Sequence, residues 1–205
     1  MALPAKAVVR ALLLGLGAPQ DERRWRAVWF LGRVAATLAG RDTEAGREVL
    51  RRLMWSLNEE SGAIGWGAAE AMAEIMSLSP VLADEFAKLL FSYLTPCANF
   101  LEHPPLQRGA VWALGRLALA RPDLARSQGA RGLLEPLLSS PDSRVAGLAA
   151  WALGNLGPGR VPAAMSDLQN DATTLCLLRD GRVLRASVGQ LSRRAMARMT
   201  RTLAA

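Results

Sequence analysis

The chain has 205 residues, is 51% hydrophobic and carries a formal net charge of +7. This apolar content is ample for one core. No window holds 18 uninterrupted apolar residues, so no membrane span is expected. Cys97 and Cys176 are the only cysteines, which are too few for a disulfide framework or a cysteine-based metal site. A reducing cytoplasm is therefore the expected location.

The positive charge comes from 23 arginines and only two lysines. Such a basic chain either binds nucleic acid or another polyanion, or its arginines reflect genome composition and only solvate helix faces. The charge is uneven, because residues 61–104 carry one base against five acids, whereas residues 158–205 carry eight bases against three acids. This unevenness favours the second interpretation.

Four similar segments recur along the chain: RWRAVWFLGRVA (24–35), GWGAAEAMAEIM (65–76), QRGAVWALGRLA (107–118) and GLAAWALGNLGP (147–158). When they are aligned on the small residues Gly32, Ala73, Gly115 and Gly154, the spacings are 41, 42 and 39 residues. A period near 40 residues, built from helical segments, predicts a solenoid of helix pairs.

Helix boundaries follow from glycine and proline. Gly17 and Pro19 close a first helix over 3–16, and Pro80 opens a helix that runs to about residue 94. A weaker helix over 123–138 is interrupted near Gly129. Other helices are expected over 21–39, 43–57 and about 161–169, and the second copy lies on a helix that runs to about residue 78. Pro104-Pro105 start the helix of the third copy, and Ser140-Pro141-Asp142 start that of the fourth, which ends at Gly157. The repeats therefore span about 3–40, 43–78, 80–121 and 123–157.

The pattern changes in the last segment, 158–205. Two short runs of strand-forming residues flank Asp180-Gly181, which predicts a β-hairpin over 173–188. A last helix is expected over about 188–203. Terminal repeats must cover the open end of a stack, so the hairpin and this helix are expected to form a C-terminal cap.

The repeated A-x-x-x-[LM]-[GA]-x-[LVI] core, with Pro141-Asp142 before its fourth copy, resembles HEAT-like repeats, and the phycobilin-lyase-type branch is closest. The resemblance covers about residues 3–170. It implies an α-solenoid. Together with the repeat period and the C-terminal pattern, this predicts an all-α fold of about four to five HEAT-like helix pairs in a single domain over 1–205, closed at the C-terminus by the hairpin and last helix. The resemblance also implies protein–protein contact.

Segments 51–75 and 99–118 look like an uncharacterised bacterial family of such proteins, which lends no activity. Nothing in the chain marks a bilin site. Some HEAT-like hydroxylases hold two irons with several His-Glu pairs, and the single histidine here excludes that mechanism.

A polar and aromatic stripe lies opposite the core face of the repeated helices. Positions seven before, three before and one after the aligned small residue share one helix face. We expect this stripe to line the concave surface and to bind a partner through Trp25, Trp29, Arg33, Trp66, Glu70, Glu74, Arg108, Trp112, Arg116, Trp151 and Asn155. The alternative is that the recurring tryptophans are wedges packed between neighbouring repeats.

Two irregular connections, 58–65 and 95–105, are expected on one edge of the solenoid. They carry Asn58, Glu59, Glu60, Asn99, Glu102 and His103. This set either binds a divalent cation or cationic ligand and serves acid–base chemistry, or its members only cap the following helix and face water. One histidine and no ligand pair at fixed spacing favour the second interpretation, so no metal, cofactor or catalytic residue is expected.

The last helix is basic. Arg194, Arg198 and Arg201 recur at helical spacing beside Arg193, and the hairpin adds Arg182 and Arg185. These residues either form a phosphate-binding patch or a solvated helix face, and the solvated face is the favoured interpretation.

The expected function is that of a cytoplasmic adaptor which binds another protein and is not an enzyme. The alternative is nucleic-acid binding, suggested by the net charge of +7 and the six tryptophans. The acidic segment 61–104 weighs against it, because it would break a continuous basic track.

Overall fold

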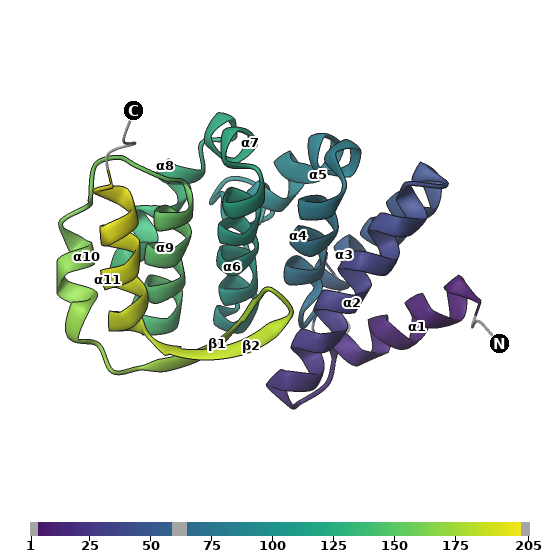
Figure 1. Ribbon diagram of the computed structural model, residues 1–205, viewed down its shortest axis with the longest axis horizontal. Helices are drawn as coiled ribbons and strands as arrows, with labels where there is room; N and C mark the ends of the chain where they lie inside the picture. Colours follow the sequence, from purple (N-terminus) through teal and green to yellow (C-terminus); the bar gives the residue numbers. More distant parts are fainter. Residues whose placement is uncertain (1–3, 59–64, 202–205) are drawn as a thin grey trace.

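A computed structural model describes residues 4–58 and 65–201, and it has two layers of helices (Figure 1). In the inner layer each helix packs against the next: α2 (Asp21–Ala39), α4 (Ala68–Leu78), α6 (Pro104–Ala120), α9 (Ser143–Asn155) and α11 (Val188–Met199). The four copies of the repeat lie on α2, α4, α6 and α9, as predicted. No helix within the described ranges is long and apolar enough to cross a membrane.

The outer layer begins with three helices and then breaks into short pieces. It comprises α1 (Ala5–Leu16), α3 (Thr43–Asn58), α5 (Pro80–Ser92), α7 (Pro122–Ser127), α8 (Ala130–Leu134), the 3₁₀ turn η1 (Pro136–Ser139), α10 (Ala164–Asp167) and the 3₁₀ turn η2 (Leu168–Asn170). The break between α7 and α8 falls at Gly129, whose φ of 75° is left-handed. The sequence therefore located this break correctly.

The three glycines among the aligned small residues lie where a neighbouring inner helix approaches closely. A methyl group on Gly154 of α9 would lie 2.6 Å from the Cα atom of Ala195 on α11. A methyl group on Gly115 would overlap the ring of Trp151, at 2.3 Å, and one on Gly32 would lie 2.6 Å from the Cβ atom of Glu74. These glycines therefore leave space for helix packing, because interiors this dense cannot accept another carbon atom without movement.

The hairpin has the predicted form. Strands β1 (Thr174–Arg179) and β2 (Arg182–Ser187) pair antiparallel. Asp180 and Gly181 both have positive φ, 51° and 77°, as a two-residue type I′ turn requires. Helix α11 follows directly, with Ser187 and Gln190 forming a capping box.

The hairpin and α11 end the solenoid, and the hairpin also runs back along the inner layer as far as α2 (Figure 1). At its tip, a methyl group on Gly181 would lie 2.9 Å from the ring of Trp29. The hairpin thus connects the last repeat to the first. We call the side of the inner layer that it crosses the hairpin face.

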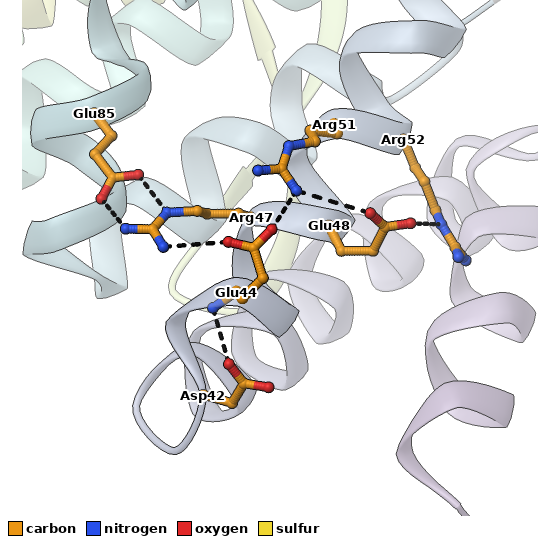
Figure 2. Close-up of polar contacts among 7 residues, drawn as sticks. All are labelled: Asp42, Glu44, Arg47, Glu48, Arg51, Arg52 and Glu85. Atoms are coloured by element: carbon orange, nitrogen blue, oxygen red, sulfur yellow. Dashed lines mark hydrogen bonds and ion pairs between the residues drawn. The ribbon is translucent and has the colours of Figure 1, made fainter.

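The outer layer carries a network of exposed ion pairs (Figure 2). Arg47 on α3 binds both carboxylate oxygens of Glu85 on α5, at 2.7 and 2.6 Å. The pKa of Glu85 is lowered by this hydrogen-bonded arginine. Glu44 bonds Arg51 and Arg47, which lower the pKa of its carboxyl group. Arg47 and Arg51 of α3 are thus neutralised locally, although exposed pairs of this kind contribute little stability.

The packing role of the small residues predicts opposite effects for two Gly→Ala substitutions. Gly154→Ala should lower the free energy of unfolding by about 1–3 kcal/mol, because the added methyl group has no room beside Ala195. Gly132→Ala in α8 meets nothing within 4 Å and should be neutral or raise stability by up to about 1 kcal/mol. Urea denaturation of both variants measures the difference, and equal effects would contradict the packing role.

Candidate functional site

A hollow of about 310 Å³ lies on the hairpin face, where the N-terminal halves of α2, α4, α6 and α9 meet the hairpin. The N-terminal ends of helices carry positive partial charge, so four inner helices contribute a positive field there. The lining residues that carry charge or aromatic rings are Asp21, Arg24, Trp25, Trp66, Glu70, Arg108, Trp112, Arg144 and Arg185.

Most of the charge in the hollow is positive. Arg108 pairs with Asp142 at 2.6 Å, and Arg24 pairs with Asp21. Arg144 donates to the carbonyl oxygen of Thr174 on β1 at 3.1 Å, and no described acid pairs with it or with Arg185. The hollow therefore presents guanidinium groups that are not neutralised by the residues around them.

Glu70 lies in this hollow on α4. Its carboxylate occupies the space that a side chain at Gly109 would fill, with Oε2 only 2.6 Å from the position of a Cβ atom there. Burial raises the pKa of Glu70 to about 7, and its own backbone N–H and nearby Arg24 offset only part of this effect. A carboxyl group that titrates near neutral pH inside a cleft is a common feature of functional sites.

The structure divides the predicted stripe into two parts, and the first lines the hollow. Trp25 and Trp112 are buried, with exposed fractions of 6% and 1%, so the expectation that they face solvent is wrong. Their rings lie 4.8 Å apart, and Trp112 stacks on Trp151 at 6.1 Å. The packing alternative therefore holds for both residues. Trp66, Glu70 and Arg108 keep part of their surface open.

The indole N–H of Trp112 is buried and has no hydrogen-bond partner in the described part of the chain. Unpaired buried donors are rare in proteins and costly. Trp112 also lines the hollow. The wall of the hollow therefore contains a donor that no described protein group satisfies.

The second part of the stripe joins the inner helices to one another and to the hairpin tip. Glu74 and Asn155 are buried, contrary to expectation, because each has polar partners. Glu74 accepts from Arg116 at 2.7 Å, and Asn155 donates to the carbonyl oxygen of Gly115 at 3.0 Å. Arg33 is exposed, and its guanidinium lies 3.8 Å from the ring centroid of Trp29. The residues of this second part of the stripe therefore contact other residues of the protein.

The two irregular connections are only partly described. Glu59 and Glu60 lie outside the described residues, whereas Asn58, Glu102 and His103 are exposed. Asn99 donates to the hydroxyl of Ser92 at 2.9 Å. His103 precedes α6, but its side chain makes no capping hydrogen bond, so the expected capping role of His103 is not observed. Its ring centroid lies 6.0 Å from that of Trp66. No cluster of three or more possible metal ligands occurs among the residues that the structure places.

Three arginines of the hollow were not identified from the sequence as members of one site. Arg24, Arg144 and Arg185 come from α2, α9 and β2. Arg24 lies outside the helical phase that defines the stripe. Arg144 shares this phase but precedes the compared positions by about one turn, and Arg185 was only expected in a separate basic patch. No signal in the sequence places a strand of the C-terminal hairpin beside the first inner helix.

Comparison with known proteins supports the repeat assignment. The HEAT-like repeat family matches residues 104–156, from α6 to the end of α9. No curated protein matches the sequence. The fold is similar to three crystal structures of engineered proteins from the Northeast Structural Genomics Consortium.

The first of these is 23% identical with a TM-score of 0.55, and the match covers 93% of this chain and 78% of that one. The second is 19% identical with a TM-score of 0.54, covering 97% and 86%. The third is 22% identical with a TM-score of 0.52, covering 96% of this chain and 50% of that chain. Likeness at this level of identity shows the fold alone, which is a helical repeat solenoid, and the match to the HEAT-like repeat family is confined to residues 104–156.

The environment of Glu70 predicts a pH-dependent effect of Glu70→Gln. The pKa of about 7 in the folded protein lies above the ordinary value of 4.5, so the wild type loses stability as pH rises from 4.5 to 7. Replacement should therefore raise the free energy of unfolding at pH 8, by at most on the order of 3 kcal/mol, and change it little below pH 5.

Denaturant titrations at pH 5 and pH 8 measure this effect. Glu74→Gln is the matched control, because it breaks a buried ion pair with Arg116 and should destabilise the protein at both pH values. A gain for Glu70→Gln that is equal at both pH values would show that its carboxyl group is not perturbed as described.

Trp112 is buried and Trp55 is exposed, so replacing each of them should affect stability differently. Trp112→Ala should cost about 3–5 kcal/mol of stability, because it empties a fully packed site. Trp55→Ala on α3, where the side chain is 77% exposed, should change stability by less than about 0.5 kcal/mol. Thermal unfolding followed by circular dichroism compares the two, and a similar small effect for both would contradict the packing of Trp112.

Proposed function

We propose that this protein is a scaffold that binds a segment of a partner protein on its hairpin face, at the hollow. The observation that carries the proposal is the set of arginines around this hollow, of which Arg144 and Arg185 have no acidic partner among the described residues. HEAT-like solenoids typically present extended surfaces for protein binding. Arginine and tryptophan are the residue types that most often anchor such contacts.

The distribution of charge supports the hairpin face over the outer layer. Arg47, Arg51 and Arg52 on the outer layer each pair with a glutamate (Figure 2). The arginines of the hollow retain more of their field, and the helix N-termini add to it. A partner segment that carries carboxylates is therefore complementary to this face.

The dimensions of the hollow support a side chain or short segment as the occupant. A volume of about 310 Å³ lies at the small end of ligand pockets. Trp66 is partly exposed and lines the hollow together with the unneutralised arginines. In this proposal the stripe residues that contact the partner are Trp66, Glu70 and Arg108, while the buried stripe residues shape the wall behind them.

Nucleic-acid binding remains the second candidate, since the net charge of +7 favours polyanions in general. The acidic residues of α5, Asp84 and Glu85, lie in the segment that interrupts the basic distribution. The likeness of the repeat core to the phycobilin-lyase-type branch stays a prediction from the sequence motif. A cytoplasmic location and the absence of catalysis likewise remain predictions.

Site-specific crosslinking tests the proposal. Cys176 lines the hollow and Cys97 is exposed on the 95–105 connection, so each can carry a thiol-attached photo-crosslinker when the other is changed to serine. We expect the probe on Cys176 to capture a defined protein from native extract, and the probe on Cys97 not to capture it. Arg144→Glu should reduce the capture at least about tenfold, as loss of a charge-assisted contact does.

Arg182→Glu is the charge-matched control, because Arg182 is exposed on β2 and does not line the hollow. Capture should survive this change, with an unchanged circular dichroism spectrum for both variants. Equal capture from Cys97 and Cys176, or equal loss in Arg144→Glu and Arg182→Glu, would contradict binding at the hollow.

A further inference from the structure

A second groove, of about 210 Å³, lies between the hairpin and α11 and brings together four arginines. Arg179 and Arg185 come from the hairpin, and Arg194 and Arg198 come from α11. The basic helix of the sequence therefore meets the basic hairpin, although Arg182 and Arg193 take no part in the lining. This groove is distinct from the hollow and shares only Arg185 with it.

The positive charge of this groove is not balanced by the protein around it. Asp180, 3.6 Å from Arg179 and 87% exposed, is the only acid paired with any of the four arginines in the described chain. The pKa of Arg198 is lowered by burial and by repulsion from Arg179, Arg201 and Arg194. Arginines stay charged at physiological pH, so this repulsion persists unless an anion enters.

One of these guanidinium groups is held in place by a chain of hydrogen bonds through the inner layer. Arg198 donates to Asn155 Oδ1 at 2.6 Å, and Asn155 donates to the carbonyl oxygen of Gly115 at 3.0 Å. A guanidinium that is already oriented loses less freedom when it binds an oxyanion, and its planar fork matches phosphate or carboxylate oxygens.

The floor of the groove is apolar. Trp151, Leu177 and Leu191 line it beside the arginines, and Leu184 is 38% exposed at the hairpin. An apolar floor strengthens the attraction between the arginines and an anion, because it lowers the local dielectric. It also offers contact area to an apolar or aromatic body attached to the anionic group.

We propose that this groove binds an anion with at least two negative charges, of phosphate or carboxylate type, attached to an apolar body. The charged group contacts Arg194 and Arg198, and the apolar body lies against Trp151 and Leu191. The proposal does not depend on partner binding at the hollow. It needs only the four-arginine groove.

Calorimetric titration with defined anions tests this site. We expect pyrophosphate and citrate to bind, acetate at equal ionic strength not to bind, and 1-naphthyl phosphate to bind more tightly than inorganic phosphate. Arg194→Gln should weaken these affinities at least about tenfold, through loss of a charge-assisted contact. Arg10→Gln on α1, which removes one exposed charge far from the groove, is the matched control and should bind as the wild type.

No binding of pyrophosphate or citrate at low salt, or equal weakening by Arg194→Gln and Arg10→Gln, would overturn the site. Equal affinity for naphthyl and inorganic phosphate would overturn the role of the apolar floor. A short peptide with adjacent Asp and Glu beside Leu is titrated alongside naphthyl phosphate. The one that binds more tightly identifies the anion as a carboxylate or a phosphate. If partner crosslinking from Cys176 is unchanged in Arg194→Gln, the groove and the hollow are separate sites.

Discussion

The close approach of neighbouring inner helices is the constraint on which this structure depends. At Gly32, Gly115 and Gly154 the facing helix lies so near that a single methyl group would overlap its atoms. This spacing brings the tryptophans of successive repeats within ring contact, as Trp112 and Trp151 show. It also aligns the N-terminal halves of the inner helices around one hollow, where their dipoles and arginines act together.

The hairpin decides which parts of the inner layer remain accessible. Its tip rests on Trp29 of the first repeat, while α11 at its other end packs on α9 (Figure 1). The hollow and the four-arginine groove lie along it and share Arg185. The hairpin is therefore a structural tie between the two ends of the solenoid and also a wall of both candidate sites.

Much of the fold followed from local rules. Gly129 and Pro80 marked a helix break and a helix start, and Asp180-Gly181 marked the hairpin turn, because proline fixes φ and glycine readily adopts the positive φ that the break and the turn require. The helical phase of the stripe also placed Trp66, Glu70 and Arg108 together on one face. The burial of Trp25 and Glu74 did not follow, since it depends on groups from other repeats: the ring of Trp112 and the guanidinium of Arg116.

The sequence by itself determined the repeat, the helices that carry it and the hairpin with its terminal helix, because these depend on contacts within one repeat or one turn. Only the tertiary structure decided that Gly154 is a packing residue rather than a flexible one, since the atom it must avoid belongs to Ala195. It also decided that Arg144 of α9 and Arg185 of β2 line the same hollow as Glu70 of α4. Such a site depends on how distant segments pack, and no periodicity in the chain encodes that arrangement.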